Sequence, residues 1–178
     1  MGWMDSTGFD ALVTRHHPEI YRYLLRTTFR ASEAEDLAQE TFLRAYRAHR
    51  TLTPDANARA WLFAIATNVA RNHFRTESRR RHAYATVHAE GSVADADGPE
   101  GQTLFNEARV RLETVVAGLP LKQRLAFTLR KVHELDYDAI ARSLDCSVDS
   151  ARAHVFQALR KIRRSLNGYG LPLGSDDR

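Results

Sequence analysis

The chain has 178 residues, of which 43% are hydrophobic and 27% are charged, so it can form one large domain or two small ones with a buried core. No apolar run approaches the roughly 20 residues that cross a bilayer, and residues 1–10 lack the segments of a secretory signal, so we expect a cytoplasmic protein without membrane insertion. The single cysteine, Cys146, excludes a disulfide framework and a cysteine-based zinc site, and the formal net charge of +4 is modest.

The charges are unevenly distributed along the chain. Residues 59–81 hold six arginines against Glu77 alone, and residues 117–167 hold ten cations against five acids. Residues 83–116, between these basic blocks, hold two arginines against six acids. Because neutralising phosphates releases counterions from nucleic acid, two basic blocks favour a nucleic-acid partner, although solvated charged helices would give the same pattern.

Helical periodicity dominates the sequence and strand-like alternation is nearly absent, which predicts an all-α fold. The first helix is expected over about residues 8–28, with a kink or a break at Pro18. The second helix is expected to begin at a capping box formed by Ser32 and Glu35 and to run to about Arg50.

A third helix is expected over about residues 56–81. Residues 89–101, with the sequence AEGSVADADGPEG, are small, acidic and rich in glycine, and this composition predicts a flexible acidic linker. Helical patterns resume over about 104–118 and again over about 119–132. The chain is therefore expected to form two small helical domains on either side of a linker.

The C-terminal part of the chain predicts a helix-turn-helix. Asp136 can cap a short helix over residues 137–144, the turn DCS follows, and Ser147 can cap a longer helix that ends near Asn167. Asp145 occupies the turn position that often needs a left-handed backbone, which aspartate tolerates better than most residues.

The longer of these two helices has an apolar face and a polar outer face. The apolar residues recur at helical spacing, at Val148, Ala151, Val155, Ala158 and Leu159. The outer residues gather near the N-terminal end, at Asp149, Ser150, Arg152, Ala153, Phe156 and Gln157. A DNA-reading helix presents this end to the major groove, where arginine can pair with guanine and glutamine with adenine. An ordinary helical hairpin with a charged face would look similar.

Three stretches in this order resemble the extracytoplasmic-function (ECF) group of bacterial RNA polymerase sigma factors. They are EAEDLAQETFLRAYRAHR, ARAWLFAIATNVARNHFR and, after the linker, LPLKQRLAFTLRKVHELDYDAIARSLDCSVDSARAHVFQALRKIRR. The resemblance covers about residues 8–167. It implies a region 2 at about 8–82 that docks on core polymerase and melts the −10 promoter element. It also implies an acidic linker at 83–103 and a region 4 at about 104–168 that reads the −35 element as duplex.

The resemblance, together with the faces that helical periodicity gives, indicates three sets of functional residues. Those expected to bind core RNA polymerase are Asp36, Gln39, Glu40, Leu43 and Arg44. Those expected to bind −10 DNA are Asn68, Arg71, Arg75 and Arg79. Those expected to bind −35 DNA are Arg130, Asp149, Ser150, Arg152, Ala153, Phe156 and Gln157. Ala64 and Thr67 depart from the family pattern, which puts the promoter sequence preference and some backbone affinity in doubt, and Ala153 and His154 also replace residues that are common in the family.

Helical periodicity supports two of these sets independently. Leu43 lies among charged residues opposite the apolar face of its helix, as an exposed partner surface requires. Asn68 lies in a stripe of arginines, which suits a single strand, because the amide can meet a base edge while guanidinium groups hold phosphates. Trp61 shares this stripe but is expected to belong to the core.

Two other functions remain open from the sequence. A stand-alone helix-turn-helix regulator would bind duplex DNA without polymerase. An enzyme with a histidine-metal site could use His16, His17, His49 or His73, but their spacing matches no metal motif, so neither catalysis nor a cofactor is expected. Since most members of the resembling family are held inactive by an anti-sigma factor that covers both domains, a separate anti-sigma factor is expected as a partner beside core RNA polymerase and promoter DNA.

Overall fold

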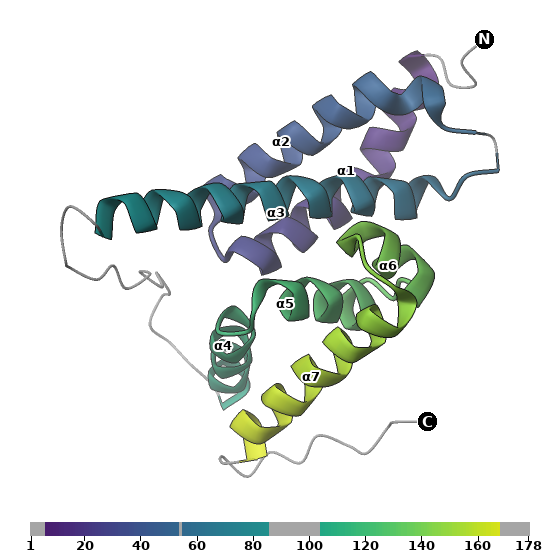
Figure 1. Ribbon diagram of the computed structural model, residues 1–178. Helices are drawn as coiled ribbons and strands as arrows, with labels where there is room; N and C mark the ends of the chain where they lie inside the picture. The colour runs from purple at the N-terminus through teal and green to yellow at the C-terminus, as the bar shows by residue number, and fades with distance from the viewer. Residues whose placement is uncertain (1–5, 54, 86–103, 168–178) are drawn as a thin grey trace.

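The computed structural model describes residues 6–53, 55–85 and 104–167, and within these residues all regular structure is helical (Figure 1). The elements of the first half are α1 (Ser6–Thr28), α2 (Ala31–Ala48), the short 3-10 helix η1 (His49–Thr51) and α3 (Ala58–Ala85). Those of the second half are α4 (Leu104–Ala117), α5 (Leu121–Phe127), the π-helix η2 (Thr128–Val132), α6 (Tyr137–Leu144) and α7 (Val148–Asn167). The predicted all-α fold is confirmed. Most of the predicted linker, residues 86–103, lies outside the described residues.

The predicted break at Pro18 does not occur, since α1 continues through it from Ser6 to Thr28. Apolar side chains on both sides of the proline are fully or almost fully buried, among them Phe9 and Leu24. Burial of several such side chains, each stabilising by roughly 1.5–3 kcal/mol, outweighs the roughly 3 kcal/mol that an internal proline costs a helix.

The predicted capping box at Ser32 and Glu35 is wrong. The N-cap of α2 is Arg30, which makes no side-chain capping bond, and Ser32 already lies inside the helix. The reason is the tight connection between α1 and α2, in which Phe29 adopts a left-handed φ of 60°. The Thr28 hydroxyl accepts the Arg30 amide at 3.3 Å, so it partly takes over the role of the missing cap.

The predicted helix over about 119–132 is two elements. α5 gives way at Thr128 to the wider turns of η2, which end at Val132. Glu134, two residues later, adopts a left-handed φ of 56°. This connection turns the chain so that α6 packs against α3.

The helix-turn-helix prediction is confirmed. The Asp136 carboxylate accepts the amide of Ala139 at 2.7 Å and caps α6. Asp145 adopts the expected left-handed conformation with φ of 52°. The Ser147 hydroxyl accepts the amide of Ser150 at 3.1 Å at the start of α7.

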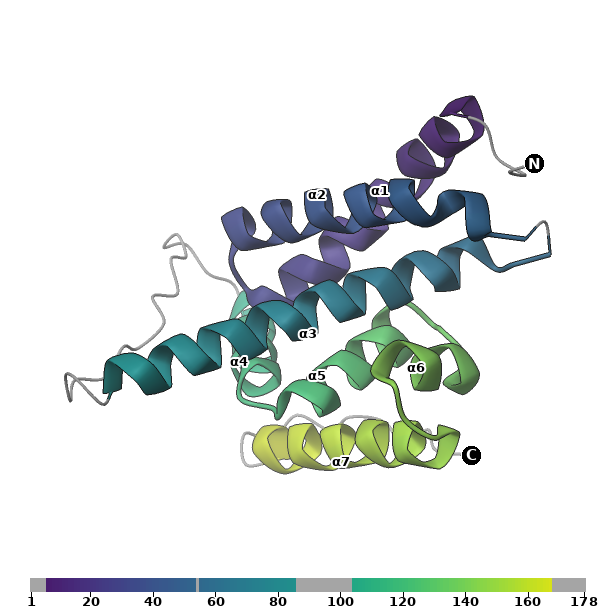
Figure 2. The same ribbon diagram turned by 45° about the horizontal axis from the view of Figure 1, so that its top comes forward.

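The two halves of the chain pack against each other, which the sequence does not predict. α6 lies against α3, and α1 contacts both η2 and α4. Buried side chains from both halves, including Tyr23, Phe63, Leu125 and Leu129, belong to one apolar cluster. Figure 2 shows the resulting order of layers, with α1 and α2 on one side, α3 in the middle, then α5 and α6, and α7 on the far side.

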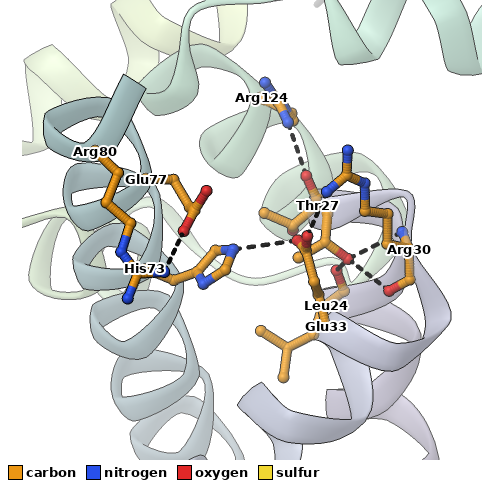
Figure 3. Close-up of polar contacts among 9 residues, drawn as sticks. Leu24, Thr27, Arg30, Glu33, His73, Glu77, Arg80 and Arg124 are labelled. Atoms are coloured by element: carbon orange, nitrogen blue, oxygen red, sulfur yellow. Dashed lines mark hydrogen bonds and ion pairs between the residues drawn. The ribbon is translucent and has the colours of Figure 1, made fainter. Parts of the chain in front are cut away.

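Two arginines make polar contacts between the halves. Arg59, which pairs with Glu19 of its own half at 2.9 Å, donates to the His133 carbonyl oxygen at 2.8 Å. Arg124 donates to the Thr27 carbonyl oxygen at 2.7 Å (Figure 3). Burial lowers the pKa of Arg124 and lowers that of His133 to about 4, so His133 is neutral in this packed form near neutral pH.

Candidate nucleic-acid and partner interfaces

The predicted polymerase-binding residues gather on one side of α2. Asp36, Gln39, Leu43 and Arg44 are exposed and Glu40 is half-buried, and we call this set the α2 outer face. Arg44 donates to the Glu40 carboxylate at 2.6 Å one turn away, which orients both side chains. The opposite side of the helix is the buried side, as predicted.

The structure adds an apolar groove beside the α2 outer face that the sequence did not reveal. The groove has a volume of about 770 Å³, and Phe9, Val13 and Tyr46 help to line it together with Leu43. Leu43 and Tyr46 are 47% and 53% exposed, although both are large and hydrophobic. Exposed apolar side chains in a rim of polar residues are typical of a protein-binding surface. Tyr46 follows Leu43 at helical spacing among charged residues, and this was the signal available in the sequence.

The predicted −10 residues form a continuous stripe along α3. Asn68, Arg75 and Arg79 are exposed and Arg71 is half-buried, and we call this set the α3 stripe. At a rise of 1.5 Å per residue the stripe is about 17 Å long. Its four side chains make no hydrogen bond or ion pair to any residue that the structure describes. The C-terminal end of α3, beyond the stripe, projects past the other helices (Figures 1 and 2). Its donors are therefore free to meet a ligand.

Two other residues of α3 are structural. Trp61 is half-buried and packs against the main apolar cluster, in line with its expected role in the core. Thr67 is fully buried, and its hydroxyl donates to the Phe63 carbonyl oxygen at 2.7 Å and lies 2.9 Å from the Tyr23 hydroxyl. Burial raises the pKa of Tyr23. Thr67, which departs from the family pattern, therefore has a packing role in the core of this structure.

The predicted −35 residues of α7 lie on one solvent-facing side. Five of the six residues that form this α7 outer face are exposed, and Ser150 is half-buried. Phe156 is 57% exposed, which is unusual for a large apolar side chain outside an interface. Downstream, Arg160, Lys161 and Arg164 are exposed and extend the basic surface.

Several side chains of the α7 outer face are held by neighbours. Arg152 donates to the Asp149 carboxylate at 3.1 Å. The Gln157 side-chain oxygen accepts from the Gln123 amide of α5 at 2.7 Å. The Ser150 hydroxyl lies 2.9 Å from that of Ser147. The surface is thus ordered before any ligand arrives.

Arg130 lies in η2, outside α7, but its guanidinium group meets the same aromatic ring as that of Arg152 on α7. Its guanidinium donates to the Leu135 carbonyl oxygen at 2.9 Å and lies 4.9 Å from the ring centroid of Tyr137. The guanidinium of Arg152 lies 5.4 Å from the same ring centroid. The sequence had not assigned Tyr137, because no local pattern shows that its ring meets arginines from both η2 and α7.

The four histidines considered for a metal site do not meet. His16 contacts the Glu19 carboxylate at 2.6 Å, and His73 contacts Glu33 at 3.1 Å (Figure 3). His17 stacks on the ring of Phe42, and His49 contacts the backbone carbonyl oxygen of Tyr46 at the end of α2. Among the residues placed by the structure, no three histidine, cysteine, aspartate or glutamate side chains are grouped to hold a metal ion. None of the described helices is long and apolar enough to cross a membrane.

Two family models match the chain. The model of sigma-70 region 2 matches residues 12–80, and the model of sigma-70 region 4 matches residues 109–162. The first segment corresponds to the group α1 to α3 and the second to the group α4 to α7.

Curated relatives match over most of their length. The RNA polymerase sigma-H factor of Pseudomonas aeruginosa is 34% identical over 169 residues, which cover 91% of this chain and 88% of that protein. The ECF RNA polymerase sigma-E factor of Escherichia coli is 30% identical, with 89% and 86% covered.

Solved structures show the same fold. The sigma factor RpoE of Bartonella quintana, in complex with the anti-sigma factor NepR, has a TM-score of 0.68 at 22% identity, with 89% of this chain and 96% of that chain covered. CnrH, in complex with the cytosolic domain of CnrY, has a TM-score of 0.66 at 22% identity, with 92% and 90% covered. The helical arrangement of this chain is therefore one that solved proteins adopt.

Proposed function

Because this chain belongs to the ECF group of RNA polymerase sigma factors, we propose that it directs promoter-specific transcription initiation. It binds core RNA polymerase, reads the −35 element as duplex DNA and melts the −10 element. The observation that carries this proposal is the combination of a partner surface on α2, the basic α3 stripe, and the α7 outer face with the exposed cations Arg160, Lys161 and Arg164 downstream of it. The protein supplies binding energy rather than a catalytic step, and it acts in the cytoplasm with polymerase.

The first step is docking through region 2, at about residues 8–82. The α2 outer face presents the exposed Leu43 among polar and charged side chains, and the groove beside it offers Tyr46. An apolar centre within a polar rim is the usual anatomy of a protein interface. Core polymerase is the partner that the family membership assigns to this surface.

The second step is the reading of the −35 element by region 4, at about residues 104–168. The N-terminal end of α7 enters the major groove with Arg152 and Gln157, and Phe156 supplies an apolar contact for a thymine methyl group. Arg160 and Arg164 lie further along the helix and meet phosphates.

The third step is melting of the −10 element by the α3 stripe. Opening a duplex costs a few kcal/mol for each extruded base. Contacts that exist only with the open strand offset this cost. Asn68 reads a base edge, while the guanidinium groups of Arg71, Arg75 and Arg79 hold the strand.

The packed arrangement of the two halves has to open on a promoter. The names of the two elements place them about 25 base pairs apart, or about 85 Å at 3.4 Å per base pair. A compact chain of this length has a radius of gyration of about 16 Å, and thus a diameter near 40 Å. It cannot touch both elements at once, so α6 leaves α3 when both are bound.

A separate anti-sigma factor is the partner that would keep the chain in the packed form. The structures of similar fold include sigma factors bound to NepR and to CnrY. In this chain a groove of about 520 Å³ lies between the two halves, with Leu25, Leu112 and Val132 among its apolar lining. Arg22, Arg26 and Arg109 also line it, which suits an amphipathic helix with acidic residues.

Run-off transcription with core polymerase on a promoter library tests the proposal. Transcripts should begin at promoters that share −35 and −10 sequences, and only when the chain and core polymerase are both present. A chain that shifts promoter duplex equally well without polymerase and yields no transcript would instead be a stand-alone helix-turn-helix regulator.

The double variant Gln39→Ala and Glu40→Ala tests whether the α2 outer face docks on core polymerase. Both side chains lie on the α2 outer face, so their loss opens no core cavity and changes stability by about 0.5 kcal/mol or less. The variant should lose transcription and polymerase binding at an unchanged Tm.

A further inference from the structure

Tyr137 is the first residue of α6, and its ring meets two arginines that come from different elements. The guanidinium carbon of Arg130 lies 4.9 Å from the ring centroid, and that of Arg152 lies 5.4 Å from it. Both distances fall within the roughly 6 Å at which a cation is attracted to an aromatic face. Tyr137 itself is half-buried and packs against the main apolar cluster, so the ring is fixed.

Each arginine has a second contact that sets its direction. Arg130 donates one N–H group to the Leu135 carbonyl oxygen at 2.9 Å. Arg152 donates one N–H group to the Asp149 carboxylate at 3.1 Å. A ring contact plus one hydrogen bond restricts a side chain that otherwise has many rotamers.

The ring contact leaves N–H donors of each guanidinium available. The attraction to a ring acts on the charge of the group, whereas its five N–H donors lie in its plane and can still form hydrogen bonds. Arg152 uses one donor on Asp149 and retains others for the two acceptors of a guanine. The Tyr137 ring therefore holds Arg152 in place without competing for the base.

We propose that Tyr137 is a positioning residue for −35 recognition, whose ring fixes Arg152 for base reading and Arg130 for an adjacent backbone contact. The inference rests on the proposed function, since it assigns a role to Tyr137 only if Arg152 reads a base. The ring, rather than the hydroxyl group, carries the effect. Side chains from three elements, η2, α6 and α7, then act together at one ring, although only Arg152 of α7 reads a base.

The test compares holoenzymes, formed from full-length variants and core polymerase, on promoters with single base changes through the −35 element. Tyr137→Leu removes the ring and keeps an apolar side chain of similar bulk against the core. It should reduce the preference for the correct base at the position read by Arg152 about two- to fivefold, the range expected for the loss of one exposed cation–π contact. Tyr137→Phe keeps the ring and should retain the wild-type preference.

Two controls separate positioning from general stability. Phe127→Leu removes another half-buried aromatic ring of region 4, one that packs against the second apolar cluster, and should leave every base preference unchanged. In the Arg152→Ala background, Tyr137→Leu should cause no further change at that base position. This non-additivity is the signature of one residue acting through another.

The outcomes distinguish this inference from the proposed function. If Arg152→Ala changes no base preference, the proposed role of α7 is wrong, and the role of Tyr137 is wrong with it. If Arg152→Ala has its effect and Tyr137→Leu has none, only the positioning role is overturned. If Tyr137→Phe behaves like Tyr137→Leu, the hydroxyl group acts directly, and the proposal is overturned in favour of a phosphate contact.

Discussion

The α3 stripe and the α7 outer face are both proposed to bind DNA, but the structure prepares them in opposite ways. On α3, Asn68, Arg71, Arg75 and Arg79 make no side-chain contact to a described residue through a hydrogen bond or an ion pair. On α7, Arg152 is held by Asp149 and by the Tyr137 ring, and Gln157 is held by Gln123. One surface is loose before binding, whereas the other is ordered.

The difference follows from the ligand that each surface is proposed to bind. Duplex DNA is stiff and presents base edges at fixed places in its groove, so a reading side chain gains from being oriented beforehand. A single strand is flexible and can adapt to the protein, so its binding depends more on charge than on direction. Changes to the α3 stripe should therefore act through salt dependence and melting, and changes near α7 through base preference.

The largest effect is expected from the triple variant Arg71→Ala, Arg75→Ala and Arg79→Ala. Three phosphate contacts to a single strand contribute about 2 to the slope of log affinity against log salt, which corresponds to about a 100-fold loss near 0.1 M salt. Binding of holoenzyme to single-stranded −10 DNA over a salt series measures this. Arg80→Ala, which removes an arginine paired with Glu77 beside the stripe, is the matched control and should leave the slope unchanged. An unchanged slope in the triple variant would show that the strand lies elsewhere.

Arg152→Ala should have the next largest effect. A bidentate arginine–base pair contributes roughly 1–3 kcal/mol of discrimination, so about a 30-fold loss of preference is expected at a single −35 position. Arg164→Ala, further along the same helix, should weaken all promoter sequences about equally. Competition binding with −35 variants measures both. If the two substitutions act alike and uniformly, Arg152 contacts a phosphate, and the contrast between the surfaces loses its main support.

Asn68→Ala should lower open-complex formation by about five- to tenfold, the range for loss of one hydrogen bond to a base. The −35 affinity and polymerase binding should not change, because the Asn68 side chain is exposed and forms no hydrogen bond to a described residue. Permanganate footprinting measures the open complex on matched promoters and on promoters whose −10 region is already mismatched. The defect should be smaller on the mismatched templates. Equal reactivity of the two proteins on matched duplex would place the melting pocket elsewhere.

The sequence could predict features that depend on neighbouring residues. The period of apolar residues gave the helices, and single side chains gave the cap at Asp136 and the left-handed turn at Asp145. The faces of α2 and α7 also followed from the 3.6-residue period, as the burial of Phe42 and Val155 shows. The positions of the predicted polymerase and DNA residues on exposed surfaces followed from the same pattern.

The features that depend on tertiary packing could not be predicted. Pro18 stays inside α1 because distant side chains bury the helix on both sides of it. Ser32 does not cap α2, because the reversal at Phe29 starts the helix earlier. The packing of α6 on α3 and the meeting of two arginines on Tyr137 join residues from separate helices, which no local pattern records.

The smallest expected effect tests the comparison most directly, because it changes the order of the α7 outer face without removing any of its residues. The Gln123 amide donates to the Gln157 side chain at 2.7 Å, while the Gln123 side-chain oxygen is buried and accepts no hydrogen bond from the described residues.

Gln123→Met keeps the length of the side chain, removes the buried unpaired oxygen and releases Gln157. Stability should therefore stay equal or rise, whereas preference at the base read by Gln157 should fall about threefold, as expected for a restraint that contributes about 0.6 kcal/mol, within the range of one hydrogen bond. Thermal unfolding and competition binding measure the two quantities, with Gln157→Ala as the reference for complete loss of the contact. If Gln157→Ala lowers the preference and Gln123→Met does not, the ordering of the surface is a by-product of packing, and the loose α3 stripe and the ordered α7 outer face differ in appearance but not in how they recognise DNA.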